Sequence, residues 1–224
     1  MSSRPTVVAQ KNFRKHSETL ENLKLEDRFR YIFDHNLWSS EESRSGVGST
    51  LTETEVLRRE VPKLLSDLQV KSILDIPCGD FRWFSQIRPE IIAYTGADIV
   101  AALIRSNTER FPQHQFLRLD LTQDPLPYAD LVLCRDCLVH LSFANIEKAI
   151  QNVKRSTAKW LLMTNFLDPA HANEDIADGD WRTLNFELAP FHFPKPERVI
   201  LENCLEADGA FSDKALCLWS PDVL

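Results

Sequence analysis

The chain has 224 residues, 43% of them hydrophobic, and carries a formal net charge of −7. This length suffices for one substantial core, and the acidic balance disfavours binding to phosphate backbones, so we expect no nucleic-acid partner. No apolar run approaches the roughly 20 residues that span a bilayer, and the polar start at Met1 is unlike a signal peptide, so we expect a cytoplasmic protein without membrane contact.

The five cysteines are an odd number in a chain too large to depend on disulfides, so we expect reduced thiols. Cys134 and Cys137 form a C-x-x-C pair, a spacing compatible with zinc or redox chemistry. No second close pair completes a zinc site, and the apolar run before Cys134 is typical of a buried strand. We therefore favour a protein without a resident metal.

Residues 1–50 are expected to form a helical and lid-like segment ahead of one domain over residues 51–224. The segment contains an aromatic cluster that includes Trp38. Residues 39–49 are poor in apolar side chains and rich in serine and glycine, which predicts a loop. This loop is either a linker or a lid whose Arg44 and hydroxyl groups touch the substrate.

Helix and strand patterns alternate from residue 52 to residue 165. Apolar residues recur at helical spacing from Leu57 to Leu68, and Ser142 is a candidate N-cap for a later helix. The further helices are expected near residues 81–87, 100–110 and 142–155, and the strands near residues 72–76, 91–98, 114–120, 130–134 and 160–165. This alternation indicates a parallel sheet that is covered on both faces.

The tail departs from this alternation. Residues 166–196 are long, polar and interrupted by prolines, a composition typical of a functional or disordered loop. Two strand patterns follow, near residues 198–206 and 214–219, with Asp208-Gly209 between them. Because Asp-Gly favours a hairpin turn, we expect this last pair of strands to be antiparallel.

Three of the predicted strands end in a carboxylate, at Asp75, Asp98 and Asp120. Asp98 follows Asp75 by 23 positions, a spacing typical of the acid that binds a ribose in a doubly wound sheet. Ligands of open α/β sheets bind at the carboxyl ends of strands, so the turn after Asp75 is the first place to look for a cofactor. A single acid of this kind is equally well explained as a helix cap.

On these residues the chain resembles the class I S-adenosyl-L-methionine-dependent methyltransferases, over about residues 53–220. The resemblance rests on Leu74-Asp75-Ile76-Pro77-Cys78-Gly79-Asp80, Asp98, Asp120-Leu121 and Asp130-Leu131-Val132-Leu133-Cys134-Arg135-Asp136. It implies an α/β, Rossmann-like, doubly wound fold with a seven-stranded, mostly parallel sheet and an antiparallel last hairpin. It also implies S-adenosyl-L-methionine as the cofactor. A nicotinamide dehydrogenase would need G-x-G-x-x-G, which the sequence lacks.

By this resemblance, Asp75 and Gly79 shape the site for the methionine moiety, Asp98 binds the ribose, and Asp120 with the Leu121 backbone holds the adenine. The residues expected at the cofactor are Asp75, Pro77, Cys78, Gly79, Asp98, Ile99, Asp120, Leu121 and Arg135. Pro77 and Phe81 stand where family members often have glycine, which restricts how the backbone approaches a ligand. The variant Asp-Ile-Pro-Cys-Gly-Asp resembles a bacterial subgroup associated with modification of surface sugars and small molecules.

Transfer to a hydroxyl group requires a base near the cofactor, and Asp136 and His140 are the candidates. If residues 136–140 form a helical turn, the two side chains share a face, so Asp136 orients His140 as the base. Alternatively, Asp136 caps a helix and His140 is structural. The pair also suits a divalent metal with His192 or Glu187 as third ligand.

The residues expected to bind the acceptor are Trp38, Arg44, Arg182, Asn185 and His192, which suit a polar, sugar-like molecule. We therefore expect a methyltransferase, monomeric or homodimeric, that O-methylates a hydroxyl group of a sugar or other small molecule. The alternatives are N-methylation of a small amine or peptide side chain, and a catalytically inactive methyltransferase-fold module that binds a partner. Methylation of nucleic-acid bases is disfavoured because Phe166 rather than proline follows Asn165.

Overall fold

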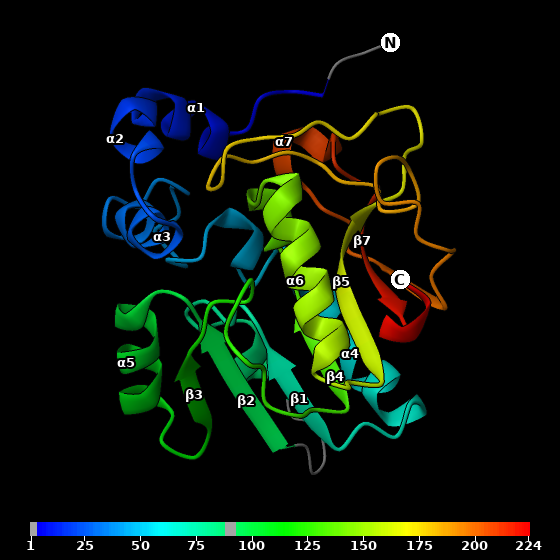
Figure 1. The fold of residues 1–224 in the computed structure, drawn as a ribbon. Helices are drawn as coiled ribbons and strands as arrows, with labels where there is room; N and C mark the ends of the chain where they lie inside the picture. Colours follow the sequence, from blue (N-terminus) through cyan, green and yellow to red (C-terminus); the bar gives the residue numbers. More distant parts are fainter. Residues whose placement is uncertain (1–3, 88–92) are drawn as a thin grey trace.

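The computed structural model describes residues 4–87 and 93–224. Its centre is a seven-stranded sheet with the order β3-β2-β1-β4-β5-β7-β6 (Figure 1). The strands are β1 (Ser72–Asp75), β2 (Ala93–Asp98), β3 (Gln115–Arg118), β4 (Leu131–Cys134), β5 (Trp160–Phe166), β6 (Arg198–Leu201) and β7 (Lys214–Trp219). The first five strands pair in parallel, whereas β7 is antiparallel to both β5 and β6. The predicted fold class is therefore confirmed.

Helices cover both faces of this sheet, as the nearly continuous apolar runs of β1 and β4 require. The main helices are α4 (Glu55–Asp67), α5 (Ala101–Arg110) and α6 (Phe143–Arg155). Ile73 of β1 packs in one core cluster with α4, and the next residue, Leu74, packs in another with α6. Ser142 caps α6 as predicted, because its Oγ accepts a hydrogen bond from the Asn145 amide at 3.4 Å.

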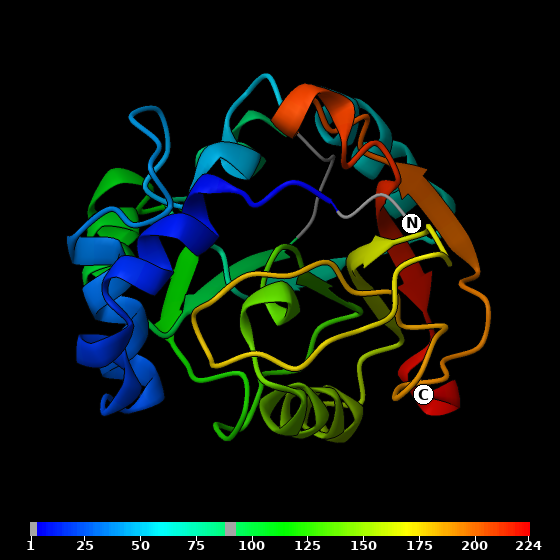
Figure 2. The ribbon, with the colours of Figure 1, turned by 90° about the horizontal axis from the view of Figure 1, so that it is seen from above.

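Three N-terminal helices lie beside the carboxyl ends of the parallel strands (Figure 1). They are α1 (Val8–Lys15), α2 (Ser17–Glu21) and α3 (Leu25–Asp34). The long loop after β5 passes over the same edge of the sheet and surrounds the segment that leads into α6 (Figure 2). In the described ranges, no helix combines the length and apolar character needed to cross a bilayer.

The expected helix over residues 81–87 is wrong. Only a single 3₁₀ turn, η2 (Phe84–Gln86), forms there; Pro89, where the sequence would end such a helix, lies outside the described residues. Phe81 adopts a left-handed φ of 58°, which a continuous helix does not allow. Its ring, with that of Phe84, packs on Tyr94, so the aromatic spacing reflects burial in a turn and not a helical face.

The expected tight Asp-Gly hairpin is also wrong, although the antiparallel pairing is right. β6 ends at Leu201, and a short helical turn, α7 (Glu206–Gly209), fills part of the connection to β7. The side chain of Glu202 turns inward from the end of β6 and is 2% exposed. The Glu202 amide still donates to the Lys214 carbonyl at 3.0 Å, so the pairing with β7 extends to Glu202, six residues before Asp208.

Candidate active site

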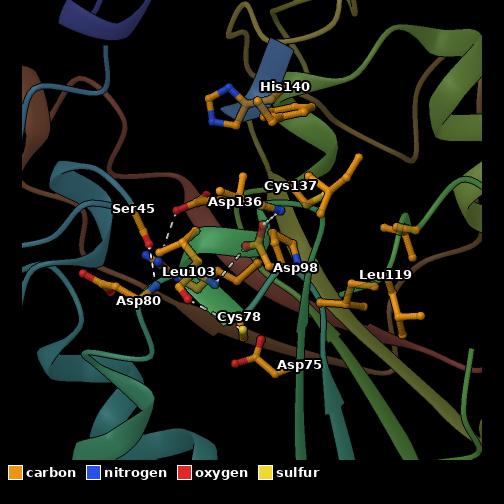
Figure 3. Close-up of a pocket in the computed structure, with 18 of the residues that line it drawn as sticks. Ser45, Asp75, Cys78, Asp80, Asp98, Leu103, Leu119, Asp136, Cys137 and His140 are labelled. Atoms are coloured by element: carbon orange, nitrogen blue, oxygen red, sulfur yellow. Dashed lines mark hydrogen bonds and ion pairs between the residues drawn. The ribbon is translucent and has the colours of Figure 1, made fainter. Parts of the chain in front are cut away.

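A pocket lies at the carboxyl edge of the sheet, over the ends of β1, β2 and β4 (Figure 3). Every residue expected at the cofactor lines it: Asp75, Pro77, Cys78, Gly79, Asp98, Ile99, Asp120, Leu121 and Arg135. Asp136, His140 and Trp38 line it as well. Parallel pairing explains this convergence, since it brings the carboxyl ends of β1, β2 and β4 to one edge.

The turn after β1 forms the floor of the pocket. The buried carboxylate of Asp75 accepts a hydrogen bond from the Tyr94 hydroxyl at 2.7 Å, and burial raises the pKa of Asp75 to about 7. Gly79 has a φ of 54°, and a Cβ at this position would lie 2.1 Å from Ser45 Oγ. Glycine is therefore required here both by the backbone conformation and by the neighbouring loop.

Asp98 joins the turn after β1 to the start of α5. Its Oδ2 accepts a hydrogen bond from the Gly79 amide at 3.2 Å, and its Oδ1 accepts one from the Val100 amide at 2.8 Å. Burial raises the pKa of Asp98 to about 6 despite these amides. Each carboxylate oxygen has a second lone pair, so the group can also accept two hydroxyl donors of a ribose.

Asp120 and Leu121 form the other end of the pocket. Oδ1 of Asp120 accepts a hydrogen bond from the Thr122 amide at 2.8 Å, which closes the turn after β3. The side chain of Asn152, on α6, donates to the Leu121 carbonyl at 2.8 Å. The turn expected to hold the adenine is thus tied to the helix beside it.

Four charged side chains form a network at the ends of β4, β6 and β7; Arg135, Glu202 and Lys214 are buried, and Asp136 is partly exposed. Arg135 donates to Glu202 at 2.6 Å and lies 3.2 Å from the Asp136 carboxylate, which Lys214 contacts at 2.6 Å. Burial alone would raise the pKa of Asp136, but the charges of Arg135 and Lys214 hold it well below its usual range. The network is balanced, with two cations and two carboxylates. Asp136 is therefore ionised, and its carboxylate is paired with Arg135 and Lys214.

His140 is oriented by a backbone carbonyl and not by Asp136. Its Nδ1 lies 2.8 Å from the Asp180 oxygen, which can only accept, so Nδ1 carries the proton and Nε2 keeps its lone pair. The expected helical turn over residues 136–140 is wrong: η3 spans only Leu138–His140, and Asp136 has a φ of 51°. Burial lowers the pKa of His140 to about 4, so the ring is neutral at physiological pH.

The long loop after β5 surrounds the segment that leads into α6 (Figure 2) and is hydrogen-bonded to it. This segment contains His140. Arg182 donates to the Leu138 carbonyl at 2.7 Å and to the Leu141 carbonyl at 2.6 Å. Residues 175–182 bond a backbone group of each of Leu138, Val139, His140, Leu141, Ser142 and Phe143. Arg182, which the sequence analysis assigned to the acceptor, does not line the pocket and instead holds this segment.

Three other residues assigned to the acceptor also lie away from the pocket lining. Arg44 donates to the Phe33 carbonyl at 2.7 Å and stacks on the Phe33 ring. The Asn185 amide donates to the Asn173 side chain at 2.8 Å within the long loop, and His192 is exposed. Trp38 alone of the five lines the pocket, and its ring centroid lies 5.4 Å from that of His140.

Within the described residues, the structure places no third metal ligand beside Asp136 and His140. Neither His192 nor Glu187 lines the pocket. Within residues 4–87 and 93–224, no group of three or more histidine, cysteine or acidic side chains is arranged to hold a metal ion. The five cysteines are free thiols, and Cys134 and Cys137 belong to the end of β4 and the segment after it.

Sequence reasoning missed two features of the site: Lys214 holds Asp136, and the Asp180 carbonyl orients His140. Ser45 and Ser49, which line the pocket, belong to the loop 39–49 that was expected to be either a linker or a lid with hydroxyl groups at the substrate. Only Lys214 left a signal, since a lysine at the start of the apolar run 214–219 needs a buried partner. His140 is bonded to the backbone carbonyl of Asp180. Every residue type has this group, so the sequence gives no indication of the contact.

Arg182→Ala is expected to lower the free energy of unfolding by about 3 kcal/mol, because buried carbonyls lose their donors at a cost of about 1–3 kcal/mol each. Chemical denaturation in urea measures this change. The control is Arg155→Ala, which removes an exposed arginine from the last turn of α6 and should cost less than about 0.5 kcal/mol. Equal stability of both variants would contradict the structural role of Arg182.

Comparison with protein families identifies a methyltransferase domain over residues 51–209. No curated protein matches the sequence. Among solved structures, the N-methyltransferase NodS from Bradyrhizobium japonicum WM9, in complex with S-adenosyl-L-homocysteine, superposes with a TM-score of 0.59 and 14% identity, covering 85% of this chain and 97% of that chain. Human N-acetylserotonin methyltransferase, in complex with S-adenosyl-L-methionine, superposes with a TM-score of 0.56 and 12% identity, covering 95% of this chain and 58% of that chain. This chain therefore spans little more than half the length of the human protein, and at such identities both likenesses describe the fold.

A family match over more than half of the chain, on the fold and pocket described above, places the chain in the methyltransferase-domain family. The chain therefore contains a methyltransferase domain, for which the sequence predicts S-adenosyl-L-methionine as the methyl donor. The side chains present fit this molecule, since the buried carboxylate of Asp98 lines the pocket and can accept ribose hydroxyls, and the turn at Asp120 and Leu121 lines the same pocket.

Proposed function

We propose that the enzyme O-methylates a hydroxyl group of a small molecule, with His140 as the general base. The observation that carries the proposal is the fixed tautomer of His140, whose Nδ1 is bonded to the Asp180 carbonyl while the ring lines the pocket. A neutral imidazole with a free Nε2 lone pair is the form that accepts a proton. Bound S-adenosyl-L-methionine supplies the electrophilic methyl group.

The surroundings of His140 favour this role over a purely structural one. The ring is tilted against Trp38, and the loop holds its backbone carbonyl through the Gly179 amide at 2.7 Å. Such a fixed base lowers the cost of aligning the acceptor hydroxyl with the methyl group. Apolar pocket residues from α3, Leu25 and Phe29, provide a wall that excludes water. Sugars and other small hydroxyl compounds are the acceptors we propose.

N-methylation of a small amine or peptide side chain is the alternative, because a neutral amine needs no base. Asp136 favours it to some extent, since an ionised carboxylate that lines the pocket can bind an amine donor. Its two ion pairs reduce that capacity. A catalytically inactive binding module is the third possibility from the sequence, and the same experiment addresses it.

The test is methyl transfer from labelled S-adenosyl-L-methionine to a panel of acceptors. The panel contains phenols, monosaccharides, primary and secondary amines, and lysine-containing peptides. We expect label on hydroxyl compounds, at a rate that falls in the His140→Asn variant. Label on amines alone would overturn O-methylation. Binding of the methyl donor without transfer to any acceptor would favour the inactive module.

A further inference from the structure

Residues 43–49, here called the serine strap, cross the turn that follows β1. Ser43 Oγ donates to Asp80 Oδ2 at 2.9 Å, and the Arg44 amide donates to the same oxygen at 3.0 Å. In return, the Asp80 amide donates to Ser45 Oγ at 2.9 Å. Figure 3 shows Ser45 and Asp80 together on one side of the pocket. One end of the strap is therefore hydrogen-bonded to the turn after β1, which is expected to bind the cofactor.

The other end of the strap is fastened to the segment after β4. Arg135 donates through Nη2 to the Gly48 carbonyl at 2.9 Å. A Cβ at Gly48 would lie 3.1 Å from the Asp136 carboxylate, so the strap passes close to the buried charges. The strap therefore bridges the ends of β1 and β4 and closes the pocket at the end expected to hold the methionine moiety.

Two serines of the strap, Ser45 and Ser49, line the pocket. Because Ser45 Oγ accepts the Asp80 amide, its own proton remains available for donation. The cations nearby are already committed, since Arg135 is paired with Glu202 and Lys214 with Asp136. Among the described residues that line the pocket, an α-carboxylate entering here meets hydroxyl donors and no unpaired cation.

We propose that Ser45 and Ser49 bind the α-carboxylate of S-adenosyl-L-methionine, so that the strap is the second half of the cofactor site. The family match begins at residue 51, so the strap lies outside the shared domain. Charge-assisted hydrogen bonds to a carboxylate are stronger than those between neutral groups, which makes two hydroxyl donors sufficient for recognition. The proposal concerns the cofactor alone and does not depend on the acceptor.

The test compares two ligands that differ only at the amino-acid end. S-adenosyl-L-homocysteine carries the α-carboxylate, whereas 5′-methylthioadenosine lacks the whole amino-acid group. Their dissociation constants are measured by calorimetry for the wild type and for Ser45→Ala, Ser49→Ala and the double variant. We expect each single substitution to weaken S-adenosyl-L-homocysteine by about 10-fold, and the affinity for 5′-methylthioadenosine to stay within about 2-fold.

Ser85→Ala is the matched control, because Ser85 follows the same turn after β1 and its Oγ donates to the Arg82 carbonyl at 2.7 Å, but it neither belongs to the strap nor lines the pocket. It should leave the ratio of the two dissociation constants unchanged. Equal weakening of both ligands in Ser45→Ala would show that the strap only closes the pocket, which overturns the proposal. Unchanged affinity for S-adenosyl-L-homocysteine in the double variant would overturn it as well. Retained binding of 5′-methylthioadenosine shows that each variant is folded.

Discussion

Asp98→Ala is expected to weaken binding of S-adenosyl-L-methionine and S-adenosyl-L-homocysteine by more than about 100-fold. The substitution removes a buried carboxylate that can accept both ribose hydroxyls, and hydrogen bonds to charged groups contribute about 1.5–3 kcal/mol each. It also releases the Gly79 and Val100 amides, which the carboxylate holds at 3.2 Å and 2.8 Å, so the turn itself loses a support. Calorimetric titration with either ligand measures the loss.

Asp130→Ala is the matched control for this experiment. Asp130 also accepts two backbone amides, those of Lys71 at 3.0 Å and Ser72 at 3.2 Å, but it precedes β4 at the opposite edge of the sheet. Its substitution should destabilise the fold without changing the affinity for the cofactor. Wild-type affinity in Asp98→Ala would contradict the ribose assignment and would move the cofactor elsewhere in the pocket.

The sheet and the cofactor half of the pocket were predictable because their signals are local. β1 and β4 are short apolar runs; β1 ends in the carboxylate of Asp75, and β4 is followed directly by Arg135 and Asp136. A parallel sheet brings such strand ends to one edge whatever the loops between them do. Asp75, Asp98 and Asp120 therefore share one pocket, although 45 positions separate the first from the last.

The acceptor half was not predictable, because its contacts join distant parts of the chain. Arg182 lies 44 residues from Leu138, whose carbonyl it binds, and the loop around it has no periodic pattern. An arginine in a polar loop has the composition of a substrate-binding residue, yet here its donors satisfy buried carbonyls. The pairing of Asp136 with Lys214 spans 78 residues and has the same cause.

The region after β1 shows how a local pattern can also mislead. Phe81 and Phe84 are three positions apart, which is helical spacing, but both rings fill a cluster around Tyr94. The left-handed φ of Phe81 follows the tight turn at Gly79, and spacing alone carries no information on that dihedral angle. The aromatic ring at Phe81 also shows that its position, where family members often have glycine, tolerates a side chain that points away from the pocket into the core.

His140→Asn is expected to reduce kcat for methyl transfer by about 100-fold to 10,000-fold, the range typical of a lost general base. The amide of asparagine can still donate to the Asp180 carbonyl, as Nδ1 does at 2.8 Å, but no atom replaces Nε2. Binding of S-adenosyl-L-homocysteine should be unchanged. His114→Gln is the control, since His114 packs on Phe81 and Tyr94 and does not line the pocket. An unchanged kcat in His140→Asn would exclude His140 as the base.

The pH dependence of the wild type tests whether His140 keeps its buried, neutral imidazole in the working enzyme. The base acts in its neutral form, and the pKa of His140 is lowered to about 4, so protonation removes activity only as the pH falls towards that value. At saturating methyl donor, which keeps Asp98 ionised in its complex, kcat/KM for the acceptor should therefore show no titration of His140 from about pH 8 to about pH 5.5. Any step near pH 7 that belongs to Asp75, whose pKa is raised to about 7, should disappear in Asp75→Asn. A histidine with an unperturbed pKa near 6.5 would instead lose about 10-fold by about pH 5.5. Such a loss would show that the imidazole is solvated in the working enzyme, and the buried arrangement around Asp180 would not be the catalytic one.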